Sequence, residues 1–130
     1  MICLDSDCII DFLKGKENAI QIIKENKDSL VTTEINVFEV WFGIYLKKEL
    51  DEKEAENTRI IFDSLEILPF DNNSGEIATK ILSKLTKKGN IVNQNDCFIA
   101  AIMIKNNCNM IITNNKKDFS RIEEIKVKSY

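Results

Sequence analysis

The sequence predicts an α/β fold in which a parallel sheet lies between layers of helices. Short apolar runs that indicate buried strands recur along the chain, and stretches with helical spacing of apolar residues separate them. Repeated strand–helix units favour a parallel sheet with right-handed crossovers. The chain has 130 residues, of which 44% are hydrophobic and 30% charged, so we expect one domain over residues 1–130.

The N-terminal stretch MICLDSDCIIDFL predicts a buried strand that ends in a carboxylate. The apolar run Met1–Leu4 stops at Asp5, and the amphipathic stretch Ser6–Leu13 predicts a helix with Ser6 as its N-cap. Ligands of open α/β sheets bind at the carboxyl ends of the strands. Asp5 is therefore the first candidate for a functional acid. Asp7 follows in the first helical turn, where the helix dipole favours a negative charge.

The remaining elements follow from apolar periodicity and from turn residues. Helices are predicted over Glu17–Asn26, Thr33–Lys48, Leu50–Leu65 and Asn72–Lys88, and strands over Ser29–Thr32, Glu66–Leu68, Met110–Thr113 and Ile125–Val127. Eight consecutive apolar residues, Cys97–Ile104, predict a central helix with Asn95 as its N-cap. That N-cap places Asp96 in the first turn, where helix capping alone would also explain an acid.

Glu39 is the only acid between Val37 and Leu46, where nearly every position is apolar. We expect this helix to be buried over most of its circumference. An unpaired carboxylate is costly to remove from water, so Glu39 needs a basic partner, a hydrogen-bonded network or a bound cation. The same helix carries Trp41, Phe42 and Tyr45, and a contact with another protein is the alternative to core packing for these aromatic residues.

Histidine is absent, which excludes Ser-His-Asp and Cys-His catalysis and His-ligated zinc. The four cysteines, Cys3, Cys8, Cys97 and Cys108, form no CxxC pair. We expect buried reduced thiols rather than a four-cysteine zinc site. The remaining carboxylate and amide oxygens suit hard cations such as Mg²⁺ or Mn²⁺.

Charge divides unevenly along the chain. Residues 1–77 carry 17 acidic and 8 basic side chains, and residues 78–130 carry 4 acidic and 10 basic ones. The basic half could receive phosphates while the acids hold a cation, although a solvated lysine surface is the simpler interpretation. No apolar run is long enough to cross a membrane and no secretion signal is visible, so we expect a cytoplasmic protein without membrane contact.

Asp5, Glu39 and Asp96 each occur beside or within an apolar element, and Thr113–Asn115 follows a predicted strand as Asp5 does. If these side chains converge, their oxygens would repel one another unless a divalent cation neutralised them, as in Mg²⁺ phosphodiester chemistry. We therefore hypothesise a metal site, with Asp118 as a further nearby acid.

Four motifs in order, LDSDCIIDFLKG, TTEINVFEVWFGI, NDCFIAA and IITNNKKDFSRI, resemble PIN-domain ribonucleases, in particular the VapC-type toxins of prokaryotic toxin–antitoxin pairs. The resemblance covers almost the whole chain. It implies a three-layer PIN-like sandwich around a parallel five-stranded sheet. It also implies a homodimer, Mg²⁺- or Mn²⁺-dependent hydrolysis of RNA by a metal-activated water, and inhibition by a cognate antitoxin protein.

The resemblance further implies that Asp5, Glu39 and Asp96 are the catalytic, metal-coordinating acids. The fourth acidic position of the family falls on Asn115, with Asp118 three residues later, so either residue is a candidate metal ligand. We expect Ser6, Asp7 and Thr113 to lie around these acids and to contact them rather than the metal.

Two alternatives remain open from the sequence. The stretch LDSDCII imitates the DxDx motif of HAD-like phosphatases, with Asp5 as nucleophile and Asp7 as acid/base, but position 9 is Ile and no late GDxxxD-like motif follows. The second alternative is a degenerate PIN fold that serves as a binding module, for which Asn115 in place of an acid is the main argument.

Overall fold

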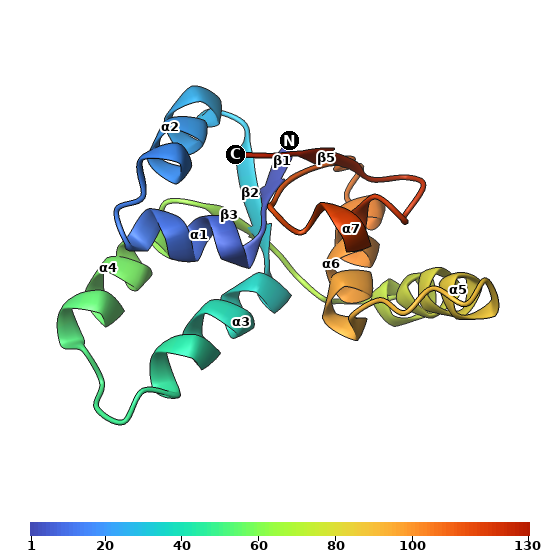
Figure 1. Ribbon diagram of the computed structural model, residues 1–130, viewed down its shortest axis with the longest axis horizontal. Coiled ribbons are helices and arrows are strands. Elements are labelled where there is room, and N and C mark those ends of the chain that lie inside the picture. The colour runs from blue at the N-terminus through green and yellow to red at the C-terminus, as the bar shows by residue number, and fades with distance from the viewer.

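The computed structural model describes all of residues 1–130 and contains a parallel five-stranded sheet with seven helices (Figure 1). The strand order is β3-β2-β1-β4-β5, and every pair of neighbouring strands is parallel. The strands are β1 (Ile2–Leu4), β2 (Leu30–Thr33), β3 (Glu66–Leu68), β4 (Met110–Ile112) and β5 (Lys126–Lys128). The predicted α/β class and parallel five-stranded sheet are confirmed.

Helices cover both faces of the sheet, which gives three layers. The helices are α1 (Ser6–Leu13), α2 (Glu17–Asn26), α3 (Glu34–Tyr45), α4 (Glu52–Asp63), α5 (Ser74–Lys87), α6 (Gln94–Lys105) and α7 (Lys116–Phe119). In Figure 1, α1, α2, α3 and α4 lie on one side of the strands, and α5, α6 and α7 lie on the other.

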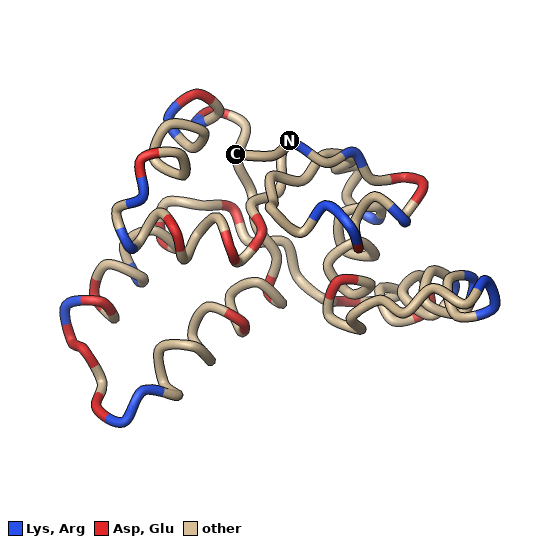
Figure 2. The backbone as a smooth tube through the Cα atoms, viewed as in Figure 1, with Lys and Arg blue, Asp and Glu red and all other residues tan.

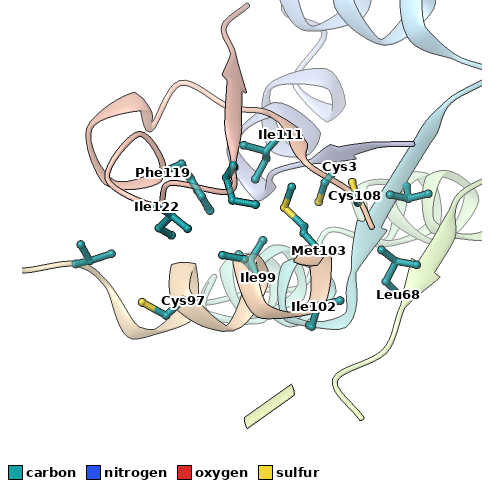
Figure 3. Close-up of a cluster of buried hydrophobic side chains, with 14 of the residues drawn as sticks. Cys3, Leu68, Cys97, Ile99, Ile102, Met103, Cys108, Ile111, Phe119 and Ile122 are labelled. Carbon is teal, nitrogen blue, oxygen red and sulfur yellow. The ribbon is translucent and has the colours of Figure 1, made fainter. Parts of the chain in front are cut away.

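Side chains of the central strands point alternately to the two faces of the sheet, so the core consists of two clusters. Cys3 and Ile111 are partners across the β1–β4 pair and belong to the cluster around α6, which Figure 3 shows with Met103 pointing toward the strands. Their neighbours Leu4 and Ile112 belong to the second cluster, under α1 and α3. Successive side chains of a strand point to opposite faces, so three-residue strands serve both layers.

Three polar residues gather at one edge of this sheet. Asp5 directly follows β1, Thr33 ends β2 and Thr113 directly follows β4. Because β1, β2 and β4 are parallel neighbours, their carboxyl ends meet at the same edge. The sheet therefore brings segments more than a hundred residues apart to one place.

Several helix starts differ from the prediction. The N-cap of α1 is Asp5 rather than Ser6, because the carboxylate of Asp5 accepts the backbone N–H of Ser6 at 2.9 Å. The N-cap of α6 is Asn93 rather than Asn95, because the Asn93 side chain accepts the backbone N–H of Asn95 at 2.8 Å. The short helix α7 was not predicted.

The prediction that the helix around Glu39 is buried on most sides is wrong. Only Asn36, Val40 and Ile44 of α3 are buried, whereas Phe38, Phe42 and Tyr45 are 57%, 54% and 61% exposed. The helix packs along one stripe, and its aromatic excess lies on the surface. Apolar composition alone does not distinguish a core helix from an interface helix.

All four cysteines are buried and free, as predicted. None of the seven helices combines the length and apolarity that crossing a bilayer requires.

Candidate active site

Asp5 lies where the carboxyl ends of β1, β2 and β4 meet and is almost fully buried, with 6% of its surface exposed. Its Oδ1 accepts the Ser6 backbone N–H and Asn36 Nδ2, each at 2.9 Å, and its Oδ2 accepts Thr113 Oγ1 at 2.7 Å. Burial raises the pKa of Asp5 to about 7, and the nearby charges of Asp7 and Glu39 act in the same direction.

Glu39 is half-buried on α3 and is held by a hydroxyl. Ser6 Oγ donates to Glu39 Oε1 at 2.7 Å, and no Lys or Arg forms an ion pair with this carboxylate. Of the three partners that the sequence left open for Glu39, the structure contains the hydrogen-bonded network.

Asp96 lies in the first turn of α6 and is only 6% exposed. Its Oδ2 accepts Asn115 Nδ2 at 3.0 Å. The pKa of Asp96 is raised to about 7, mainly by burial and in addition by the charges of Asp5, Glu39 and Asp118. Asp96 is therefore close enough to Asp5 and Glu39 for their charges to act on it, and the three acids form one electrostatic cluster.

Asp118 is the fourth acid of this cluster. It comes from the short helix α7, whose entry loop follows β4. Asn115 Nδ2 donates to Asp96 Oδ2 and also faces Asp118 Oδ2 at 3.4 Å, so the amide bridges the two carboxylates. Asn115 therefore lies between Asp96 and Asp118, and of the two candidates for the fourth position only Asp118 carries a negative charge.

Asp7 and Thr113 hold the loop that leads to these residues. Asp7 Oδ1 accepts the Cys8 backbone N–H at 2.7 Å, while its Oδ2 accepts the Asn114 backbone N–H at 2.9 Å and faces Thr113 Oγ1 at 3.2 Å. Burial raises the pKa of Asp7. Thr113 is fully buried, and its hydroxyl also accepts the Asn115 backbone N–H at 2.9 Å. These contacts fix the loop between β4 and α7 against the start of α1.

Asn36 was missed at the sequence level. It is fully buried and donates from Nδ2 to Asp5 Oδ1 and to Ser6 Oγ, at 2.9 and 3.0 Å. The available signal was a polar residue three positions before Glu39 in an apolar helix, because residues at that spacing share one face.

All of the hydrogen-bond donors to the clustered acids are neutral. The five ion pairs of the structure involve none of Asp5, Asp7, Glu39, Asp96 and Asp118. Figure 2 shows acidic residues near the middle of the molecule, where α1 and α6 begin, while basic residues gather at the outer end of α5. The cluster therefore keeps a negative charge that no side chain cancels.

This donor set fits a hard divalent cation. Its oxygens come from carboxylates and one amide, which Mg²⁺ and Mn²⁺ prefer, and no basic group competes for them. No three carboxylate or thiolate side chains are already closed into a coordination site. The fit is therefore one of chemistry and charge.

The chain has relatives among known proteins. It matches the family model described as PIN domain over residues 2–125. It is 35% identical over 99 residues to ribonuclease VapC3 of Methanocaldococcus jannaschii, with 76% of this chain and 94% of that protein covered. It is 26% identical over 108 residues to ribonuclease VapC2 of Rickettsia felis, with 83% of this chain and 78% of that protein covered.

Solved structures share the fold. VapBC2 from Rickettsia felis, bound to a promoter DNA fragment, has a TM-score of 0.88 at 23% identity and covers 100% of this chain and 99% of its own. DNA-bound VapBC from Salmonella typhimurium has a TM-score of 0.85 at 23% identity, with 98% and 96% covered. At these identities, the likeness to the solved structures is one of fold.

Proposed function

We propose that this chain, which belongs to the PIN-domain family and to its VapC-type branch, is a metal-dependent endoribonuclease and the toxin of a toxin–antitoxin pair. The observation that carries the proposal is that the charges of Asp5, Glu39 and Asp96 act on one another, while each of these acids accepts hydrogen bonds from neutral donors only. Such a cluster is costly in the free protein, and it fits a site that takes up a cation. The ribonuclease name of the relatives supports RNA as the substrate.

In this proposal, Asp5, Glu39 and Asp96 hold Mg²⁺ or Mn²⁺, and Asp118 and Asn115 complete the rim of the site. When bound, the ion supplies an activated water and stabilises charge that develops on the phosphate oxygens. The protein's own part is to orient the carboxylates through the hydrogen bonds of Ser6 and Thr113.

The substrate backbone needs positive charge beside this acidic site. Lys116 and Lys117 open α7 next to the loop that carries Asn115, are exposed, and pair with no acid. We propose that these lysines contact RNA phosphates, which would offset the repulsion between RNA and the acids.

The direct test is metal removal from the purified protein. We expect EDTA to abolish cleavage of a single-stranded RNA, and excess Mg²⁺ or Mn²⁺ to restore it, because the carboxylates alone supply no activated water at neutral pH. Product formation on a denaturing gel measures the effect. An Asp5→Asn protein is the matched control for a contaminating nuclease. Equal, metal-independent behaviour of both proteins would instead favour the binding-module alternative.

The phosphatase alternative predicts a different result at Asp7. Both carboxylate oxygens of Asp7 are engaged with the start of α1 and the β4–α7 loop, which supports a structural role over that of a free acid/base. We expect Asp7→Asn to lower RNA cleavage by no more than about 10-fold, since an amide retains one of the two acceptor oxygens. The wild type should release no phosphate from p-nitrophenyl phosphate. Phosphate release that disappears in Asp7→Asn would support the phosphatase.

Assembly belongs to the proposal as well. We propose a homodimer that is inhibited by an antitoxin protein, because the solved structures with this fold include VapBC complexes. A hollow between α1, α3 and α4, with Leu13, Val40 and Ile44 in its wall, offers an apolar groove for an antitoxin segment. The exposed aromatic residues of α3, Phe38, Phe42 and Tyr45, lie on another face of that helix and offer a second surface for a protein contact.

A further inference from the structure

The side chain of Asn36 makes four hydrogen bonds beside the carboxyl ends of β1 and β2. Its Oδ1 accepts the Thr33 backbone N–H at 3.3 Å and Thr33 Oγ1 at 2.7 Å. Its Nδ2 donates to Asp5 Oδ1 at 2.9 Å and to Ser6 Oγ at 3.0 Å. A primary amide has two donor hydrogens and one acceptor oxygen with two lone pairs, so all of this capacity is used. A fully buried amide with this set of partners has one orientation.

The hydrogen-bond partners also determine which atom of the Asn36 amide is the oxygen and which is the nitrogen. The backbone N–H of Thr33 can only donate, so the Asn36 atom that faces it is the oxygen. The NH₂ group then faces Asp5 and Ser6. Because Ser6 Oγ accepts from Asn36, its single proton is free for Glu39 Oε1, 2.7 Å away. The hydrogen bonds therefore run in one direction, from Asn36 through Ser6 to Glu39.

A neutral donor is what this position requires. A lysine or arginine here would orient the carboxylates equally well, but it would cancel the charge that a cation needs. The amide gives two hydrogen bonds and leaves the carboxylate charge intact. Its own position is set by Thr33, at the end of β2, through the capping box of α3.

We propose that Asn36 is a positioning residue for the metal site: it orients Asp5 directly and Glu39 through the Ser6 hydroxyl. The inference rests on the proposed function and adds a residue outside the carboxylate set. Partners of metal-binding side chains typically change metal affinity or activity by about 10- to 100-fold when they are removed. Asn36 belongs in this class because it links acids from two different elements of the fold.

The test uses the full chain with Asn36→Leu, which preserves the approximate volume and removes all donors, and with Ser6→Ala, which removes only the second link. We expect both variants to bind Mn²⁺ more weakly by calorimetric titration, Asn36→Leu by about 10-fold or more. We also expect kcat for RNA cleavage, per folded molecule, to fall by about 10- to 100-fold, while KM for RNA changes by no more than about 2-fold. The double variant should be little worse than Asn36→Leu alone, because both changes break one chain of bonds.

A structural control separates positioning from simple loss of stability. Asp51 is the exposed N-cap of α4 and accepts the Lys53 and Glu54 backbone N–H groups. Asp51→Ala should lower the Tm and leave Mn²⁺ affinity and kcat unchanged. Wild-type Mn²⁺ affinity and kcat in folded Asn36→Leu, or losses that add in the double variant, would overturn the inference. A wild type without metal-dependent cleavage would instead overturn the proposed function itself.

Discussion

Replacing Asp96 with asparagine is expected to abolish RNA cleavage and at the same time to stabilise the metal-free protein. Cleavage should fall by about 10²- to 10³-fold, because the proposed site loses one of its three carboxylates. With it the site loses several kcal/mol of the transition-state stabilisation that the metal provides. Stability should rise because Asp96 is buried beside Asp5, Glu39 and Asp118 with no cation of the protein to balance it. Asparagine has the same shape and can still accept from Asn115.

The sign of the pH dependence follows from the direction of the pKa shift. The pKa of Asp96 rises from about 4 in an unfolded chain to about 7 in the folded protein. The folded state therefore prefers the protonated acid, and ionisation removes stability as pH increases from about 4 to about 7. The Tm gain of Asp96→Asn in EDTA should be largest above pH 7 and should vanish near pH 4.

Thermal unfolding and RNA cleavage on the same samples check both halves of this prediction. Asp28→Asn, an exposed acid with no side-chain partner, is the matched control and should change neither property. A Tm that falls in Asp96→Asn at pH 8 in EDTA would contradict the repulsion argument. Undiminished cleavage would remove Asp96 from the catalytic set.

The fold was largely predictable because its elements have strong local signals. The central strands β1 and β4 are short apolar runs, and the helices α2 and α5 show clear apolar spacing. The four-residue helix α7 is too short to show any period, which explains why it was missed. The caps of α1 and α6 were misplaced because Ser6 and Asn95 are good N-cap residues that follow the actual caps by one and two positions.

The candidate site was predictable only in part, and for a physical reason. An acid directly after a strand, or alone in an apolar helix, is visible in the sequence, which is how Asp5 and Glu39 were found. The partner of Asp5 on α3 lies 31 positions away, and no local pattern marks that contact. Similarly, the hydrogen bonds of Asn115 with Asp96 and Asp118 depend on the course of the loop after β4, which contacts Asp7, and no local pattern marks them.

The exposed face of α3 is expected to be a binding surface, and a charge placed there should disrupt assembly. Phe38 and Phe42 stack with their ring centroids 5.6 Å apart and are more than half exposed, and Tyr45 extends the same face. Exposed aromatic groups of this kind are typical of the centre of an interface. Phe42→Asp should therefore weaken self-association or antitoxin binding by at least about 30-fold, the equivalent of about 2 kcal/mol.

The fold itself should tolerate this change, since Phe42 contributes little to the core. We expect the Tm of Phe42→Asp to stay within about 2 °C of the wild type. Ile91→Asp is the matched control, because Ile91 is 90% exposed and lies in the loop between α5 and α6. Sedimentation equilibrium measures self-association, and calorimetry with the antitoxin from a neighbouring gene measures the complex. If both affinities are unchanged in Phe42→Asp, the aromatic face has no role in assembly. Phe38 and Phe42 would then be stacked on each other only to limit their contact with water.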